Sequence, residues 1–234
     1  MDQSTFFNAD FSRRVAIDTT AEPWLPSPEP GVDRRLLDRV GGEVARATSL
    51  VRYAPGARFA AHEHGGGEEF LVLEGVFSDE HGNYAAGTYV RNPPGSRHRP
   101  YSEGGCTLFV KLRQFASGDD KRVVTRPEAA GWSAYSESGV SRLILHRHGA
   151  ERVALIRFAP DARVADDPHP GGEELFVLEG VLSDEVGRYP AGTWLRNPAG
   201  SAHAPFSEPG CLFYVKSGHL YADRAQTDVR RPLA

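Results

Sequence analysis

The chain has 234 residues and a formal net charge of −4, and 40% of its residues are hydrophobic, enough for one large or two ordinary domains. Charges of both signs are mixed along the chain, so neither a nucleic-acid-binding surface nor a membrane-surface patch is expected. The two cysteines lie outside any Cys-x-x-Cys motif, which excludes a disulfide framework and a thiolate zinc site. Because there is no secretory signal and no apolar run approaches the ~20 residues that span a bilayer, we expect a cytoplasmic protein.

Residues 1–31 are expected to form an extended lead-in to the rest of the chain. Near its start, apolar residues such as Phe6 and Phe11 could pack on a neighbouring surface or form an edge strand. Four prolines between residues 22 and 31 exclude a helix and a central strand, because proline lacks the backbone N–H that both require. Trp24 would anchor this segment, and an unstructured leader is the alternative.

From residue 32 onward, short apolar runs alternate with turn signals. The sequence predicts a hairpin over residues 34–53, followed by strands over residues 59–64, 68–73, 88–91 and 107–111. Glycine and proline occupy the intervening turns, as in Asn92-Pro-Pro-Gly95. Short strands with turns at this density are typical of an all-β sandwich or barrel of the jelly-roll type.

The second half of the chain repeats the first. Gly66-Gly-Glu-Glu returns as Gly171-Gly-Glu-Glu, and Arg91-Asn-Pro returns as Arg196-Asn-Pro, each 105 residues later. More than half of the positions between residues 51 and 111 are identical in the two copies, without a gap. The sequence therefore predicts two copies of one domain, with the boundaries 32–116 and 132–221, a linker at 117–131 and a polar surface tail at 222–234.

Two histidines and a glutamate in the first copy have the spacing of a metal site. His62 and His64 lie two positions apart, so on a strand both imidazoles point to one face. Three glycines then turn the chain, and Glu68 arrives at the start of the next apolar run. Imidazole and carboxylate groups suit a divalent transition metal such as iron, zinc, nickel or manganese, and three or four protein ligands leave coordination positions open.

The spacing from Gly56 through these ligands to Gly75, followed by a second cluster that ends at His98, resembles the two signature motifs of the cupin superfamily. Ser102 stands where the second motif often has an asparagine. The runs Gly-Gly-Glu-Glu, Val-Leu-Glu-Gly and Arg-x-Pro-x-Gly-Ser-x-His look more narrowly like the ChrR-type cupins, which are grouped with dihydroxyacetophenone-dioxygenase-like enzymes. The resemblance implies two tandem cupin domains, each a double-stranded β-helix or jelly roll. It assigns metal ligation to His62, His64, Glu68 and His98.

The second copy departs from this pattern at one ligand position. Asp167 stands in place of a histidine, whereas His169, Glu173 and His203 keep the residue types of the first copy. Two interpretations stay open: a second metal site with two carboxylates, which would favour a harder ion, or a structural copy that has lost its metal. Because only the first copy has the three-histidine set, the chemistry is expected there.

Arg91 is the one candidate for a catalytic role outside the metal ligands. It lies beside the second motif and could orient an anionic or enolate substrate. The alternative is a structural ion pair with Asp79 or Glu80. Glu69 should point away from Glu68 on a strand, and we expect it to form a salt bridge or lie at the rim.

Three further residues are predicted to be structural or at the surface. His146 belongs to a His-Arg-His run with no carboxylate after it, and we place it at the surface near a hairpin tip. Cys106 and Cys211 are expected to be small buried hydrophobic side chains.

The resemblance implies a metal-dependent enzyme, most simply an Fe(II)-type dioxygenase of a small chelating ketone or diketone, with no nucleic-acid or membrane partner. The alternative is a non-catalytic, ChrR-like zinc-binding sensor. Residues 1–50 contain no Cys and no His, so such a sensor would lack the zinc-binding anti-sigma domain of ChrR. A metal-independent cupin of the sugar-isomerase type is disfavoured by the retained ligands. Both a monomer and a homodimer stay open.

Overall fold

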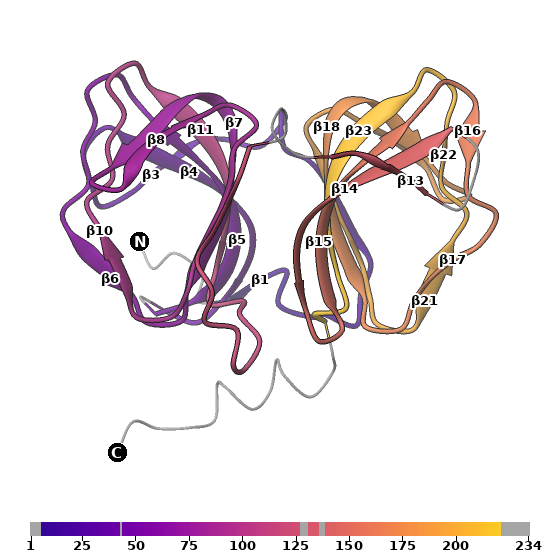
Figure 1. Ribbon diagram of the computed structural model, residues 1–234, viewed down its shortest axis with the longest axis horizontal. Coiled ribbons are helices and arrows are strands. Elements are labelled where there is room, and N and C mark those ends of the chain that lie inside the picture. The colour runs from indigo at the N-terminus through magenta and orange to yellow at the C-terminus, as the bar shows by residue number, and fades with distance from the viewer. Residues whose placement is uncertain (1–5, 43, 127–130, 136–138, 221–234) are drawn as a thin grey trace. The chain divides into compact units, whose positions relative to one another are not determined.

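The computed structural model describes residues 6–42, 44–126, 131–135 and 139–220, and this part of the chain consists of strands and turns without a helix. It therefore contains no helix that is long and apolar enough to cross a membrane. The strands form two compact units (Figure 1). One unit comprises Met1–Ala9 and Glu22–Ala130, and the other comprises Asp10–Ala21 and Gly131–Ala234. The all-β prediction is confirmed, whereas the predicted tail at 222–234 lies outside the described residues.

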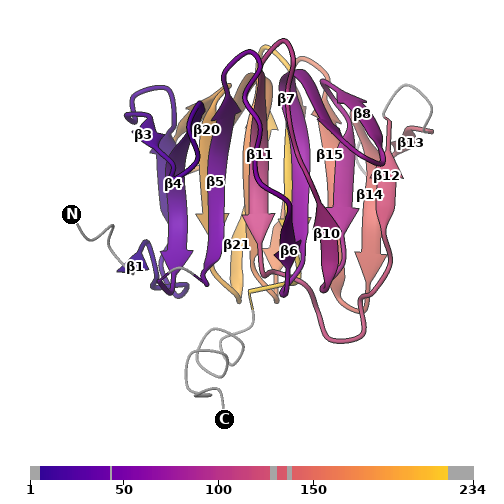
Figure 2. The same ribbon diagram turned by 90° about the vertical axis from the view of Figure 1, so that its left-hand side faces the viewer.

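The first unit has a nine-stranded sheet in the order β1-β4-β5-β11-β7-β9-β12, with β3 beside β4 and β8 beside β7. A separate pair, β6 and β10, forms a small antiparallel sheet (Figure 2). The predicted hairpin over residues 34–53 is present as β4 and β5. The bounds are β1 Phe6–Phe7, β3 Leu25–Pro26, β4 Val32–Val40, β5 Arg46–Tyr53, β6 His62–His64, β7 Glu68–Asp79, β8 Gly82–Ala85, β9 Tyr89–Asn92, β10 Ser96–His98, β11 Cys106–Leu112 and β12 Val123–Thr125.

The second unit repeats this plan. Its large sheet has the order β13-β14-β15-β23-β18-β20-β2, with β16, β19 and β22 attached, and its small sheet pairs β17 with β21. The bounds are β2 Val15–Asp18, β13 Ser133–Ala134, β14 Val140–His148, β15 Glu151–Phe158, β16 Ala162–Arg163, β17 Asp167–His169, β18 Glu173–Ser183, β19 Arg188–Pro190, β20 Thr193–Asn197, β21 Ser201–His203, β22 Phe206–Ser207 and β23 Cys211–Ser217.

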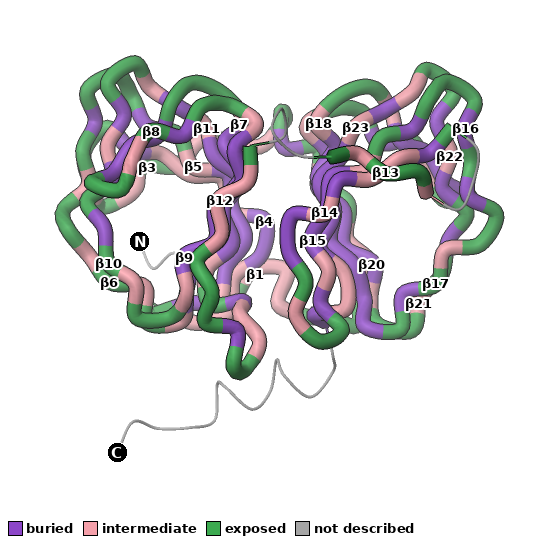
Figure 3. The backbone as a smooth tube through the Cα atoms, viewed as in Figure 1, coloured by how far each residue is buried: buried purple, intermediate pink, exposed green. Residues whose placement is uncertain are grey.

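The small sheet of each unit closes a jelly-roll barrel. In Figure 1 the pair β6–β10 lies across its barrel from β5, and the pair β17–β21 lies across the other barrel from β15. Buried residues line the strands of both barrels, while exposed residues concentrate in the turns (Figure 3). The core of the first barrel includes Phe70, Phe77 and Tyr84, whereas the second barrel has Leu175 and Leu182 at the positions of the two phenylalanines.

The two units exchange an edge strand. The segment before the first repeat adds a strand to the second unit, and the segment before the second repeat adds one to the first unit. β2 pairs with β20 in the second unit, with Val15 opposite Arg196. β12 pairs with β9 in the first unit, with Val123 opposite Arg91, the same position in the fold. Part of the predicted lead-in and part of the predicted linker are therefore edge strands of the two sheets rather than connections outside them.

A close backbone approach explains one glycine that both repeats share. Gly75 has φ of +71°, and a Cβ atom there would lie 2.1 Å from the carbonyl oxygen of Gly105. Gly180 meets Gly210 in the same way in the second unit, at 2.0 Å. Any side chain at these positions would collide with the backbone of the neighbouring strand. The close approach of the two strands therefore explains why the Val-Leu-Glu-Gly run ends in glycine.

The surface position predicted for His146 is wrong. This residue lies on β14 next to a bulge and is only 8% exposed. The bulge between Ile144 and His146 reverses the side-chain alternation of the strand, which a strict two-residue period in the sequence does not reveal. The two cysteines are buried and free, as predicted.

Candidate metal sites

The first unit brings three histidines to one point. His62 and His64 lie on β6, and His98 lies on β10, directly opposite His62 in the antiparallel register. Their ring centroids are 4.7, 5.0 and 4.8 Å apart in the three pairs. One nitrogen from each ring lies within 4.8 Å of the others, so all three can face a single ion.

Glu68 completes this group from the start of β7. Its Oε2 atom lies 3.3 Å from His64 Nε2 and 3.6 Å from His98 Nε2. The Asn92 side-chain amide donates a hydrogen bond to the same oxygen at 3.3 Å, from the neighbouring strand β9. The structure therefore places the carboxylate that the sequence predicted against two of the three imidazoles.

The spacing of the donors fits one transition-metal ion. His64 Nε2 and His98 Nε2 are only 2.9 Å apart, close for two ring nitrogens unless a proton or a cation lies between them. Two neighbouring ligands that are each ~2.1 Å from an ion stand about 3 Å apart. The donors of His64, His98 and Glu68 thus have the separations that one ion requires, and a nitrogen of His62 lies within 4.8 Å of those of the other two histidines.

Hydrogen bonds at the far side of two rings hold their Nε2 atoms toward the centre. His98 donates its Nδ1–H to Asp79 at 3.2 Å, and His62 donates its Nδ1–H to the Ala60 carbonyl at 2.8 Å. These tautomers are the ones that leave the Nε2 lone pair for a metal, and carboxylate or carbonyl partners of this kind are usual around metal-bound histidine.

The two buried imidazoles have opposite pKa shifts. Burial lowers the pKa of His64, aided by the nearby His98 and His62 rings and opposed by Glu68. Burial alone would also lower the pKa of His98, but the hydrogen bond to Asp79 and the charge of Glu68 raise it above its ordinary value. Neutral His64 is the form that can ligate a metal.

The second unit assembles four donors at the equivalent place. Asp167 and His169 lie on β17, His203 lies on β21 and Glu173 begins β18, with one ligand atom from each within 4.8 Å of the others. Glu173 Oε1 is 3.4 Å from His169 Nε2 and 3.6 Å from His203 Nε2, and Asp167 Oδ2 is 3.9 Å from His203 Nε2. All four residues predicted for a second site therefore meet.

This second group also meets the requirements of a cation site. His169 Nε2 is buried and has no hydrogen-bond partner among the described residues, although it faces Glu173. His203 donates its Nδ1–H to Asp184 at 3.0 Å, and the Asn197 amide donates to Glu173 at 3.0 Å. Burial raises the pKa of Glu173 despite His203 and Asn197. A cation would satisfy the orphaned nitrogen and favour the ionised carboxylate.

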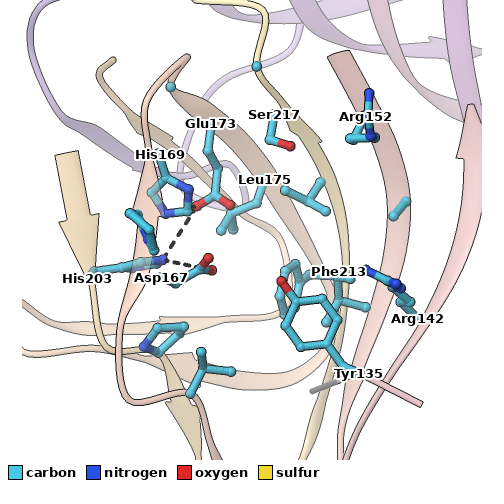
Figure 4. Close-up of a pocket in the computed structure, with 18 of the residues that line it drawn as sticks. Tyr135, Arg142, Arg152, Asp167, His169, Glu173, Leu175, His203, Phe213 and Ser217 are labelled. Atoms are coloured by element: carbon cyan, nitrogen blue, oxygen red, sulfur yellow. Dashed lines mark ion pairs between the residues drawn. The ribbon is translucent and has the colours of Figure 1, made fainter. Parts of the chain in front are cut away.

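A cavity of about 430 Å³ adjoins the second group. Asp167, His169, Glu173 and His203 lie on one side of it, and the arginines of β14 and β15 lie on another (Figure 4). The sequence favoured the first copy for the chemistry, yet this cavity belongs to the second.

Arg91 does not lie at the metal site. Its guanidinium forms buried ion pairs with Glu69 and Asp119, and its side chain is completely buried. The next residue, Asn92, faces the other side of the sheet and contacts Glu68, because successive side chains of a strand alternate between faces. The predicted substrate-orienting role of Arg91 is thus replaced by a structural one, and the salt bridge predicted for Glu69 is confirmed.

Asp79 and Asn92 are site residues that the sequence analysis missed. Asp79 accepts hydrogen bonds from His98 Nδ1–H at 3.2 Å and from the Tyr84 hydroxyl at 3.0 Å, and the ion-pair partners described for Arg91 are Glu69 and Asp119 instead. A signal was available, because Ser-Asp-Glu and Arg-Asn-Pro both recur in the two repeats with their aspartate and asparagine unchanged. Of the polar residues in these repeated runs, Asp79 and Asn92 contact ligands, whereas Arg91 pairs with Glu69 and Asp119 instead.

The family model described as the ChrR Cupin-like domain matches residues 12–116 and again residues 120–221. Each match begins shortly before one of the exchanged edge strands, β2 or β12. None of the curated proteins matches the chain.

Several solved structures share the fold at low sequence identity. A candidate dioxygenase from Nostoc punctiforme has a TM-score of 0.75 and 16% identity, covering 89% of this chain and 84% of that one. A bacterial pirin from Escherichia coli in complex with nickel(II) has a TM-score of 0.67 and 13% identity, covering 88% and 98%. Oxalate decarboxylase of Bacillus subtilis, studied for its Mn(II) centres, has a TM-score of 0.62 and 13% identity, covering 88% and 77%. At these identities the likeness shows the fold.

Proposed function

Because the chain belongs to the ChrR cupin-like family over both of its repeats, we propose that it is a metal-binding bicupin that acts as a dioxygenase-like enzyme on a small chelating ketone or diketone. The observation that carries the proposal is the convergence of His62, His64 and His98 on one point inside a barrel, with Glu68 against His64 and His98. The solved structures of this fold include proteins described with nickel(II) and Mn(II) and a candidate dioxygenase, which is consistent with the proposal.

The chain's own groups would hold and shape such a site. The three imidazoles and Glu68 would bind a divalent transition metal, which would supply Lewis acidity and, in the case of iron, an electron source for reaction with dioxygen. Asp79 fixes the tautomer of His98. The rings of Phe59, 4.8 Å from His62, and Phe77, 6.1 Å from His98, give the site apolar neighbours suited to the carbon skeleton of a ketone.

Metal analysis and oxygen uptake test the proposal together. The protein is purified without added metal, its metal content is measured by mass spectrometry, and oxygen consumption is followed with a panel of 1,2- and 1,3-diketones. Iron near one equivalent per occupied site, together with oxygen uptake, would support the proposed dioxygenase activity. A bound metal without uptake on any diketone would contradict the enzyme, and absence of metal at every loading condition would contradict the metal site itself.

A non-catalytic metal or small-ligand sensor is the second candidate. It is favoured by the family match, which is to the cupin-like domain of ChrR. Residues 1–50 contain neither Cys nor His, so these residues do not supply a zinc-binding anti-sigma segment of the ChrR kind. Stoichiometric zinc with no turnover would favour this function over the enzyme.

A further inference from the structure

One row of side chains in the second barrel joins the candidate metal group to an arginine. Arg152 on β15 lies opposite Ser217 on β23, and Ser217 lies opposite Glu173 on β18. All three residues line the 430 Å³ cavity, so they share the inner face of the sheet. With neighbouring strands ~4.8 Å apart, the backbones of Arg152 and Glu173 stand about 10 Å apart, and only a serine side chain lies between them.

The same row in the first barrel is apolar. There Ala47 on β5 lies opposite Leu112 on β11, and Leu112 lies opposite Glu68 on β7. The two repeats therefore share the glutamate but differ in what stands beside it. The second barrel has Arg152 and the small Ser217 where the first barrel has Ala47 and Leu112.

A second arginine reaches the same cavity from β14. Arg142 lies opposite Ile156, its guanidinium carbon is 5.2 Å from the centre of the Tyr135 ring, and its Nε atom is buried without a hydrogen-bond partner among the described residues. Figure 4 shows Arg142 and Arg152 on the side of the cavity away from His203.

Among the described residues, both arginines contact neutral partners only. Arg152 donates through Nη1 to the carbonyl oxygens of Gly149 and Glu151, at 2.6 and 2.8 Å. Within the part of the chain that the structure describes, no carboxylate forms an ion pair with Arg142 or Arg152. By contrast, Arg91 in the first barrel has two carboxylate partners. Guanidinium groups that line a cavity without a carboxylate in contact with them are positioned to bind an anion.

We infer that the cavity of the second unit binds a small organic acid, with its carboxylate on the side of the cavity that Arg142 and Arg152 line and its remaining oxygen atoms directed at the group formed by Asp167, His169, Glu173 and His203. The planar guanidinium favours a carboxylate because it can donate two parallel hydrogen bonds to it. A cavity of this volume lies toward the small end of ligand sites, which span roughly 300–1,000 Å³. An oxo acid of a few carbon atoms has the length to connect the two ends.

The inference deepens the proposed function and rests on it only for the end of the ligand that faces the metal group. It places recognition of the small molecule in the second barrel, whose metal-binding group differs from that of the first barrel by Asp167. It also changes the substrate class from a neutral diketone to an anionic oxo acid in that barrel. Binding of the carboxylate by the arginines does not require turnover.

Calorimetric titration with two matched probes tests it. Acetoacetate carries the carboxylate, and methyl acetoacetate is its neutral ester with the same chelating oxygens. We expect the wild-type protein to bind acetoacetate at least tenfold more tightly than the ester. Arg152→Ala introduces the residue that the first barrel has at this position, and Arg142→Gln removes only the charge. Each should weaken acetoacetate binding by about 10- to 100-fold, as for the loss of a charge-assisted hydrogen-bond pair.

Two further variants make the test specific. Ser217→Leu introduces the residue of the first barrel and should reduce binding of both probes by filling the cavity. Arg34→Gln, at the position in the first barrel that corresponds to Arg142, should leave acetoacetate binding unchanged. Metal content and near-ultraviolet circular dichroism of every variant are measured in parallel, so a change in the metal group or a failure to fold is recognised directly.

The outcomes separate this inference from the proposed function. Arginine-dependent binding of acetoacetate supports the inference even if no oxygen is consumed. Equal binding of acetoacetate and its ester, or wild-type affinity in folded Arg142→Gln and Arg152→Ala proteins, would overturn it even if the protein proves to be a dioxygenase.

Discussion

Asp79 Oδ2 accepts a hydrogen bond from His98 Nδ1 at 3.2 Å, although the two residues are 19 positions apart on different strands. The second unit has the same arrangement between Asp184 and His203. The bond orients the imidazole and raises its basicity as a ligand, and it persists in the repeat that has replaced one of its own histidines.

We therefore expect Asp79→Asn to weaken metal binding at the first site by about 10- to 100-fold without unfolding the barrel. The affinity is measured by competition with a chromophoric zinc chelator. Glu80→Gln is the matched control, since Glu80 is exposed and its carboxylate accepts a hydrogen bond from the backbone N–H of Arg99 rather than from a ligand histidine. An affinity unchanged by Asp79→Asn would mean that Asp79 does not support the ligand.

Loss of individual imidazoles tests the ligand assignment itself. His62→Ala and His98→Ala each remove one of the three converging rings, and we expect each to abolish stoichiometric metal binding at the first site. His81→Ala is the control, because His81 is exposed and belongs to a turn of the same unit. Metal retained at the first site after both substitutions would refute the assignment of His62 and His98 as ligands.

The repeat offers a natural substitution for the second site. Asp167→His would give it the donor set of the first site, and a third imidazole should shift its preference from Mn²⁺ toward Zn²⁺ and Ni²⁺. The measurement uses a His98→Ala background, in which the second site alone binds metal, and compares the affinities for the three ions. The same preference with and without the substitution would show that Asp167 is not a ligand.

The residues nearest to the metal groups could be predicted from the sequence because their relationships are local. His62 and His64 share a face by the two-residue period of a strand, and Glu68 follows after one glycine turn. The second motif supplied His98 only through a family resemblance. In the structure the three histidines converge, and Glu68 contacts His64 and His98.

The remaining features depend on how distant strands align. Whether Arg152 lies in one row with Ser217 and Glu173 is decided by the register of three strands, and bulges shift that register. The exchange of β2 and β12 is decided by tertiary packing of short strands that resemble a lead-in and a linker in sequence. The role of Arg91 depended on which carboxylates the topology brings to it, and Asp119 is one that no local pattern connects to it.

Arg91 provides a prediction about stability. Its replacement by methionine would leave Glu69 and Asp119 buried without their positive partner, and we expect a loss of about 3–5 kcal/mol in the free energy of unfolding. Urea denaturation measures this loss. Arg58→Ala is the control: it removes an exposed pair with Glu103 and should cost at most about 1 kcal/mol. Metal binding should be unchanged in both proteins. A loss of metal in folded Arg91→Met would show that this side chain acts on the site after all.

Cys106 leads to a prediction about pH. Burial raises the pKa of its thiol to about 11, although hydrogen bonds with Ser102 and the Tyr53 backbone act in the opposite direction. In the unfolded chain a cysteine has a pKa of about 8.5. The folded state therefore holds the proton to higher pH than the unfolded state. The stability due to the neutral thiol is complete below about pH 8.5 and falls as the pH rises toward 11.

Alkylation by iodoacetamide in a Cys211→Ser background measures this shift, because only the thiolate reacts. At pH 8 the folded protein should react on the order of 100-fold more slowly than the urea-unfolded chain, since roughly one thiol in a thousand is ionised at three units below its pKa. The rate should then rise about tenfold for each pH unit up to pH 10, whereas the rate of the unfolded chain should level off above pH 9. A folded-state rate that levels off near pH 9 would mean that the thiol is exposed to water. Such a result would contradict the buried position of Cys106 on β11, opposite Gly75.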